Sequence, residues 1–419
     1  MPVKTASFFK RSALPALAVF FSSILVTSMF WAVAPTKFEG EEGSDYLAFY
    51  RPVAVQITEG RGITIPDGNP AIRYPPGFSL MLSGLFRLSN AFGISEVRLL
   101  AAFTLLCMAV TSVLVFSIAG SVWSTLPSLL AAFAWMTYPL MLWITRGPAS
   151  EVPFVLLVYT AFFLFWNSLS KNRQSFLNYF LAGLAIGSAM LVRPAAIGIG
   201  LLMGLILWFG KREFSARLRL TLVATLLLGN LIVVLPWEAF VYSRTGRIVI
   251  LSSGGVPSVR DGLTYAVNLK GFREGSAVPT GVKLLMEDIQ SHYEELRSLS
   301  DIGSIMGREF VAHPVAVVEL LGLKIARSWY GTDSQRMEFP ILMVQLFYLL
   351  FVVLSTRAAW KQGGHPRLLA VTVWFIVLYF WGMTALVLSI ARYMIPGMGL
   401  LFVLLPALVP ANRNRIASA

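Results

Sequence analysis

Ten stretches of mostly apolar residues run through this chain of 419 residues and restrict what it can fold into. Each is close to the roughly 20 residues that a helix needs to cross the hydrocarbon core of a bilayer. They cover residues 13–34, 97–119, 126–144, 151–168, 176–192, 194–209, 220–241, 339–356, 368–388 and 394–410. Only 13% of the residues are charged, which is too few to cover the surfaces of two or three soluble domains. We therefore predict an all-α integral membrane protein with about ten transmembrane helices.

Basic residues are concentrated in alternate connections between these stretches. Five such segments hold 14 of the 34 Lys and Arg residues but a single acid, Glu213; the basic residues are Lys4, Lys10, Arg11, Lys171, Arg173, Lys211, Arg212, Arg217, Arg219, Arg357, Lys361, Arg367, Arg413 and Arg415. Basic loops stay on the cytoplasmic side of a membrane, so both termini are expected there. The other residues balance at 20 basic against 20 acidic, and the net charge of +13 therefore indicates orientation and not a nucleic-acid surface.

This orientation places two large segments, residues 35–96 and 242–338, on the outer side, which we expect to be the periplasmic face of a bacterial inner membrane. The chain then divides into an N-terminal membrane region (1–241) that includes the first outer loop, an outer subdomain with an interfacial helix (242–338), and C-terminal membrane helices (339–419). We expect the first helix to be retained. A cleaved signal peptide is the alternative, because residues 32–34 have the small residues of a cleavage site.

The first outer loop gathers acids, prolines, glycines and aromatic residues, and chemistry is expected there. Ser44 is suited to cap a short helix with one apolar face lying on the membrane, formed by Tyr46, Phe49, Tyr50 and Val53. Asp45 then falls in the first turn, where the helix dipole favours an ionised carboxylate that can accept a proton. A structural role for Asp45 as cap or dipole partner is the alternative. Pro52 is expected to kink or end the helix.

An extended turn follows at Tyr74-Pro75-Pro76-Gly77. The two prolines favour an extended backbone, and Gly77 is expected to let the chain turn into the apolar run 78–88. That run is suited to an interfacial helix, with a re-entrant segment as the alternative.

Ionisable residues at the ends of other apolar stretches converge on the same outer side. Glu151 begins the fourth stretch, and Arg146 just before it is one candidate partner. Arg193 and Arg392 lie in later outer connections. A carboxylate that takes a proton and arginines that neutralise phosphate oxygens suit transfer from a lipid-linked phosphate. A lipid-linked sugar flippase or transporter is the alternative, but transporter charges are expected near the midplane.

Further along the outer subdomain, Pro314 is suited to start a helix that carries Lys324 and Arg327 on one face. Those two side chains are candidates for contact with lipid phosphate, and anchoring at the membrane interface is the alternative. The chain contains one cysteine, Cys107, three scattered histidines and no nucleotide-binding or zinc-binding motif. The sequence thus predicts no cofactor with certainty.

Several motifs in the same order resemble GT-C-type glycosyltransferases, the family of dolichyl-phosphate-mannose protein mannosyltransferases and bacterial lipid A aminoarabinose transferases. The motifs are Asp45-Tyr46, Glu59-Gly60-Arg61-Gly62, Tyr74-Pro75-Pro76-Gly77-Phe78, Ser150-Glu151, Gly183 and Gly187 with Leu191-Val192-Arg193-Pro194, Pro236-Trp237 with Gly246-Arg247 and Ser252-Ser253-Gly254-Gly255, and Arg392-Tyr393-Met394-Ile395-Pro396.

The resemblance implies a polyprenyl-phosphate sugar as donor and a glycan, lipid or protein as acceptor. It implies that Asp45 is the general base for an inverting transfer, that Glu151 supports the acceptor or metal side of the site, and that Arg193 and Arg392 bind the donor phosphate. Relatives often carry a paired Asp-Glu at the first position, whereas Asp45 lies between Ser44 and Tyr46. A divalent metal is therefore left open.

Overall fold

The computed structural model describes residues 5–171, 174–265, 278–332, 335 and 337–410. These residues form helices and the connections between them, with no strand and with one isolated bridge between Thr64 and Pro70. The predicted all-α fold is confirmed. Four of the basic residues used to predict the orientation lie outside the described residues: Lys4, Arg173, Arg413 and Arg415.

Six helices in the described part of the chain are long and apolar enough to cross a bilayer. They are α1 (Thr5–Val33), α4 (Glu96–Gly120), α7 (Glu151–Ser170), α10 (Ala216–Thr245), α15 (Glu338–Gln362) and α16 (Gly364–Leu386). Each coincides with one of the stretches predicted from the sequence.

The other four predicted stretches are helical but shorter or interrupted. They form α5 (Thr125–Met136) with α6 (Pro139–Ile144), α8 (Phe176–Val192), η2 (Pro194–Ala196) with α9 (Ile199–Gly210), and η5 (Ala391–Met394) with α17 (Ile395–Phe402) and η6 (Leu405–Leu408). Proline opens α6 and η2, because its ring cannot continue a preceding helix. Every residue of α17 is buried among the longer helices. The number of membrane crossings stays a prediction.

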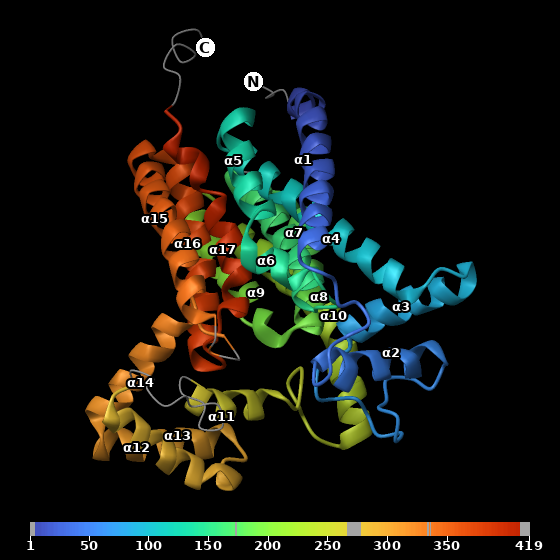
Figure 1. Ribbon diagram of the computed structural model, residues 1–419. Helices are drawn as coiled ribbons and strands as arrows, with labels where there is room; N and C mark the ends of the chain where they lie inside the picture. The colour runs from blue at the N-terminus through green and yellow to red at the C-terminus, as the bar shows by residue number, and fades with distance from the viewer. Residues whose placement is uncertain (1–4, 172–173, 266–277, 333–334, 336, 411–419) are drawn as a thin grey trace.

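The helices run back and forth between two ends of the molecule (Figure 1). The end that carries residues 35–95, 246–265 and 278–332 is called the loop end. The opposite end, called the basic end, carries the end of α7, the start of α8, the connection 211–215 and the turn at Gly363. The connections therefore alternate between the two ends as the charge pattern predicts.

Helices α8 and α10 approach closely because glycines line their contact. A Cβ on Gly183 would lie 2.0 Å from the carbonyl oxygen of Leu226, and one on Gly229 would lie 2.3 Å from that of Phe180. Gly183 and Gly187 are four residues apart and share this face, an arrangement that lets membrane helices pack backbone to backbone. The packing fixes the end of α8, from which Arg193 extends.

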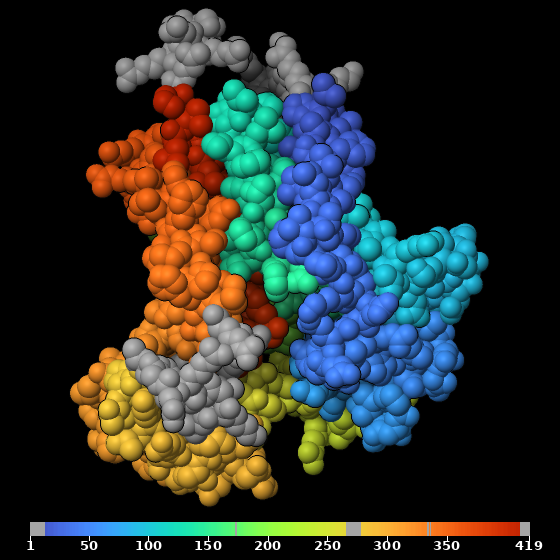
Figure 2. All heavy atoms as spheres, in the orientation of Figure 1, coloured from blue at the N-terminus to red at the C-terminus, as the bar shows by residue number. Residues whose placement is uncertain are grey.

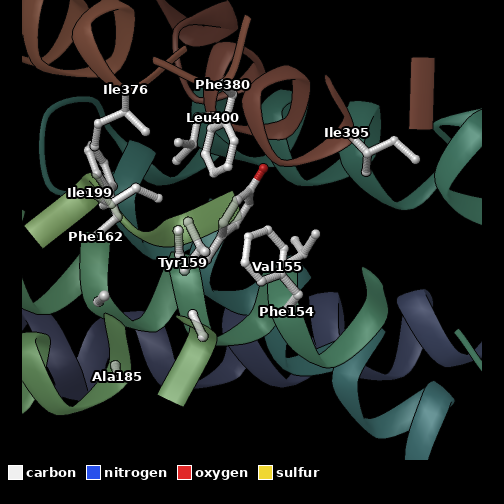
Figure 3. Packing of buried hydrophobic residues seen from close by; sticks show 14 of the residues in the cluster. Phe154, Val155, Tyr159, Phe162, Ala185, Ile199, Ile376, Phe380, Ile395 and Leu400 are labelled. Atoms are coloured by element: carbon white, nitrogen blue, oxygen red, sulfur yellow. The ribbon is translucent and has the colours of Figure 1, made fainter. Parts of the chain in front are cut away.

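The centre of α7 is tied to the C-terminal segment. The Tyr159 hydroxyl donates a hydrogen bond to the carbonyl oxygen of Pro396, at 2.7 Å. Figure 3 shows the Tyr159 side chain reaching from α7 toward Phe380 and Leu400. Glu151 at the start of α7 and Arg392 just before α17 are thereby held by one packed core.

Four helices at the loop end share a separate apolar core. They are α11 (Gly255–Tyr265), α12 (Thr280–Ser291), α13 (Leu299–Ala312) and α14 (Pro314–Arg327). A Cβ on Gly262 would lie 1.5 Å from the carbonyl oxygen of Val387, so α11 lies directly on the end of α16. On the face shown in Figure 2, the surface is hollowed between these helices, in yellow and orange, and the first outer loop, in blue.

Candidate active site

The first outer loop contains a continuous helix from Tyr46 to Thr58. A π-helical turn, η1 (Tyr46–Tyr50), leads directly into α2 (Arg51–Thr58). Pro52 does not end the helix; it lies in the first turn of α2, directly after the π-helical turn. The backbone instead changes from π to α just before it, and such π-turns are frequent at functional sites.

The apolar face of this helix packs inside the protein and not on the membrane as predicted. Tyr46, Phe49, Tyr50 and Val53 are all buried. Tyr74 covers them: its ring centroid lies 5.1 Å from that of Phe49 and 5.2 Å from that of Tyr50. The sequence pattern identified one apolar face correctly but could not show that a later segment of the same loop would cover it.

Asp45 lies at the start of η1 with its side chain exposed. The Tyr74 hydroxyl donates a hydrogen bond to Oδ1 of Asp45, at 3.0 Å. Burial, together with the charge of Asp45, raises the pKa of Tyr74, so the phenol keeps its proton and acts as a donor. Tyr74 therefore orients the Asp45 carboxylate.

The turn from Tyr74 to Gly77 lies on the end of α8. Pro75 and Pro76 are buried, and α3 (Gly77–Phe92) begins immediately after them. A Cβ on Gly77 would lie 2.6 Å from the carbonyl oxygen of Leu191. Gly77 is not among the described residues with positive φ, so this turn does not depend on a left-handed backbone at Gly77. Glycine is needed there because two backbones meet.

The apolar run 78–88 forms the amphipathic helix α3, which packs on α2 at the loop end (Figure 1). Phe78, Leu82 and Phe86 are buried, whereas Leu80 and Leu88 are exposed. A helix with one buried apolar face and further apolar side chains exposed is the pattern expected of an interfacial helix.

Glu151, at the start of α7, lies between two arginines. Its Oε1 atom is 2.7 Å from Nη1 of Arg193 and 3.9 Å from Nε of Arg392. The side chains of Glu151, Arg193 and Arg392 are 12%, 16% and 39% exposed. Glu151 thus contacts both arginines, and Arg392 is the most exposed of the three side chains.

Aromatic residues connect these arginines to the Asp45 side of the site. The Tyr393 ring centroid lies 5.1 Å from Cζ of Arg193 and 5.2 Å from Cζ of Arg392. Tyr50 stacks on Tyr74, and its hydroxyl lies beside Ser150, which accepts a hydrogen bond from Arg193 at 2.9 Å.

Neither Tyr50 nor Tyr393 was predicted as a site residue. Tyr393 follows directly on Arg392 in its motif, and that position was the available signal. Tyr50 was assigned to a membrane face, and nothing in the sequence indicates its contact with the arginine side.

Three basic residues singled out in the sequence lie elsewhere. Arg146 is not the partner of Glu151; it donates to the carbonyl oxygen of Pro35 at 2.8 Å. Lys324 is buried, and its Nζ atom donates to the carbonyl oxygen of Gly262 at 2.7 Å. Arg327 is also buried and forms an ion pair with Glu338 at 2.5 Å. The shared face of Lys324 and Arg327 thus binds protein groups, and we do not include either residue in the donor site.

The second outer segment reaches the same turn. The Ser253 amide donates to the carbonyl oxygen of Ile72 at 2.9 Å, and the Gly254 amide donates to that of Arg73 at 3.2 Å. Leu251, just before, has a φ of 58°, a strained value for a branched residue. Its amide donates to the Glu238 carboxylate at 2.7 Å, which holds this conformation. Glu238 therefore positions the segment next to Tyr74.

Among the described residues, no group of three or more His, Cys, Asp or Glu side chains is arranged to hold a metal ion. Glu151, which the resemblance placed on the acceptor or metal side, faces two arginines instead. The contacts of Glu151 therefore favour a role in holding guanidinium groups.

Residues 73–239 match the family model of dolichyl-phosphate-mannose-protein mannosyltransferases. This stretch includes Tyr74, Glu151 and Arg193, whereas Asp45 and Arg392 lie outside it. No curated protein matches the chain.

The fold is similar to that of solved membrane glycosyltransferases. The Archaeoglobus fulgidus oligosaccharyltransferase AglB, in complex with an inhibitory peptide and a dolichol-phosphate, is 12% identical, with a TM-score of 0.52 over 95% of this chain and 50% of that chain. The A. fulgidus enzyme tethered to an acceptor peptide is 14% identical, with a TM-score of 0.55 over 96% and 50%. Cupriavidus metallidurans ArnT bound to undecaprenyl phosphate is 14% identical, with a TM-score of 0.45 over 96% and 77%.

This chain therefore has the multi-pass membrane fold of GT-C glycosyltransferases, and it spans about half the length of the archaeal enzymes. The family match over residues 73–239 and the similarity in fold both agree with the family that the sequence motifs resemble.

Proposed function

We propose that this protein transfers a sugar from a polyprenyl-phosphate donor to an acceptor of the cell envelope, which is lipopolysaccharide, a protein or another glycan. The reaction takes place at the outer face of a bacterial inner membrane. The observation that carries the proposal is the group formed by Glu151, Arg193 and Arg392, which lies at the loop end and is joined through Tyr50 and Tyr74 to Asp45.

Asp45 acts as the general base. Its carboxylate takes the proton of an acceptor hydroxyl, and the acceptor oxygen attacks the anomeric carbon of the donor sugar. A bond forms between this carbon and the acceptor oxygen while the bond from the carbon to the phosphate oxygen breaks. The bonding electrons leave with the polyprenyl phosphate, and attack opposite the leaving group inverts the configuration. Tyr74 keeps the carboxylate aimed at the acceptor.

The two arginines stabilise the leaving phosphate. Guanidinium groups bind phosphate oxygens through charge-assisted, two-pronged hydrogen bonds, and they act where charge develops in the transition state. Glu151 holds both guanidinium groups in place next to the position proposed for the donor phosphate. Arg392, the most exposed of the three, is the first to meet the phosphate.

A lipid-linked sugar flippase remains the competing function. The position of the charged group favours transfer, because Glu151 and Arg193 lie at helix ends and not at the middle of the bundle.

The experiment is a transfer assay with the purified full chain in liposomes. A panel of undecaprenyl-phosphate monosaccharides, labelled on the sugar, is supplied together with cell-envelope lipids, glycans and proteins as acceptors. We expect label to move to one acceptor class while free undecaprenyl phosphate accumulates. Movement of the intact labelled lipid across the bilayer without loss of its sugar would support the flippase and contradict the proposal.

A further inference from the structure

A cavity of about 450 Å³ opens between α15 and α16 at the basic end, far from the candidate active site. Its lining comes from one face of α15 and from Trp374 of α16. Val353, Arg357 and Lys361 follow at intervals of four residues and therefore form one stripe on α15. Because α15 has 25 residues and is roughly 37 Å long, this stripe lies at the opposite end of the bundle from Glu338.

Aromatic residues shape the cavity. The Trp374 indole donates a hydrogen bond to Oγ1 of Thr356, at 3.0 Å, and joins the two helices. Trp360 is 49% exposed, and the Cζ atom of Arg367 lies 4.1 Å from its ring centroid. Tryptophan at this depth is typical of the level where headgroups meet acyl chains.

The cavity is rich in positive charge. Arg357, Lys361 and Arg367 are all exposed, and no described acid forms an ion pair with any of them. Glu213, the acid of the neighbouring connection, pairs with Lys211 at 3.3 Å. An anion that enters the cavity therefore meets cations that have no competing carboxylate.

The polarity of the stripe changes along its length. Lys361 lies at the end of α15, Arg357 lies one turn deeper, and the apolar Val353, which is 59% exposed, lies one turn deeper again. This order matches a phospholipid, with charge at the headgroup level and hydrocarbon below it. A soluble anion would gain nothing from the exposed apolar surface next to the cations.

We propose that this cavity binds the headgroup of an anionic membrane phospholipid, with its acyl chains lying on the exposed faces of α15 and α16. The site is separate from the proposed donor site and lies at the other end of the molecule. Basic cavities between helices at the cytoplasmic surface suit such headgroups.

The test is lipid binding by the purified full chain, measured by native mass spectrometry and by thermal unfolding. Dioleoyl phosphatidylglycerol is titrated against a phosphatidylcholine background. The cavity variant is Arg357→Gln with Lys361→Gln. The matched control, Arg212→Gln with Arg217→Gln, removes the same charge from exposed residues at the same end.

We expect phosphatidylglycerol to raise the unfolding temperature of the wild type and of the control variant. For the cavity variant, we expect the dissociation constant to rise about 25-fold, because each basic residue near an anionic lipid contributes roughly 1 kcal/mol and 1.4 kcal/mol corresponds to a factor of ten. Equal losses of phosphatidylglycerol affinity in the cavity variant and the control variant would indicate general attraction to the basic surface and overturn the proposal. An equal shift of the wild type by inorganic phosphate would assign the cavity to a soluble anion and overturn it as well.

Discussion

The Glu151 carboxylate lies 2.7 Å from the guanidinium of Arg193, and both side chains are more than four-fifths shielded from solvent. Each of these two buried charges is therefore stabilised by its partner. In Glu151→Gln the Arg193 cation stays buried without its partner, and we expect a loss of stability of about 3 kcal/mol. The weakened hold on Arg193 and Arg392 should also raise KM for the donor.

Thermal unfolding in nanodiscs and donor titrations measure the two effects of Glu151→Gln. Glu319→Gln is the matched control, because Glu319 is exposed on α14 and should tolerate the change. Unaltered stability and KM in Glu151→Gln would show that the ion pair neither stabilises the site nor positions its arginines.

Asp45 and Asp67 are two exposed acids of the first outer loop, but only Asp45 receives a hydrogen bond from Tyr74. An amide cannot take the acceptor's proton, so we expect Asp45→Asn to lower kcat at least about 100-fold, a typical loss for a general base. Asp67→Asn should keep near wild-type activity. Labelled-donor transfer assays on both variants make the comparison, and equal activity would remove Asp45 from the role of base.

Gly77 and Gly84 lie in the same helix, α3, but in different surroundings. A Cβ on Gly77 would meet the backbone of Leu191 at 2.6 Å, whereas a Cβ on Gly84 would meet nothing within 4 Å. We expect Gly77→Ala to cost roughly 1–3 kcal/mol and to shift the Tyr74 turn. Gly84→Ala should stabilise α3 by about 0.5–1 kcal/mol through helix propensity. Opposite shifts in unfolding temperature are the expected result, and a shift of the same sign in both would contradict the close approach.

Much of this architecture is readable from the sequence, because apolar length and loop charge are local properties. All ten predicted stretches are helical, and Asp45, Tyr74, Glu151, Arg193 and Arg392 lie along one connected group of contacts at the loop end. The partners of charged residues were harder to predict. Arg146 is near Glu151 in sequence, yet the partner is Arg193, which the close packing of α8 on α10 brings there.

Lys324 and Arg327 show a second limit. Their spacing correctly indicates a shared face, but that face is buried against Gly262 and Glu338. Whether a helix face meets lipid or protein depends on distant segments of the chain. The same limit explains why Tyr46, Phe49, Tyr50 and Val53 were assigned to the membrane surface.

The orientation of the chain can be tested with single cysteines, because the native Cys107 is only 2% exposed and should not react. Ser304 lies exposed on α13 at the loop end, and Ala216 lies exposed at the start of α10, at the basic end. In spheroplasts, a membrane-impermeant maleimide should label Ser304→Cys but not Ala216→Cys until the membrane is opened. The reverse pattern would invert the topology and move the candidate active site to the cytoplasm.

Lys324 predicts a pH dependence that does not involve catalysis. Burial lowers the pKa of its amine to about 8, from an ordinary value of 10.5. Between these values the unfolded chain binds more protons than the folded chain, so stability should rise with pH across the window from about 8 to 10.5, by up to about 3 kcal/mol. Below pH 8 the amine is charged in both states and its contribution to stability is constant.

The control variant is Lys324→Gln, which keeps a donor for the Gly262 carbonyl but removes the titrating amine. Subtracting the unfolding temperatures of Lys324→Gln from those of the wild type at each pH cancels the other titrating groups, and the difference should climb only above pH 8. A flat difference would show that the amine is as well solvated in the folded protein as in the unfolded chain.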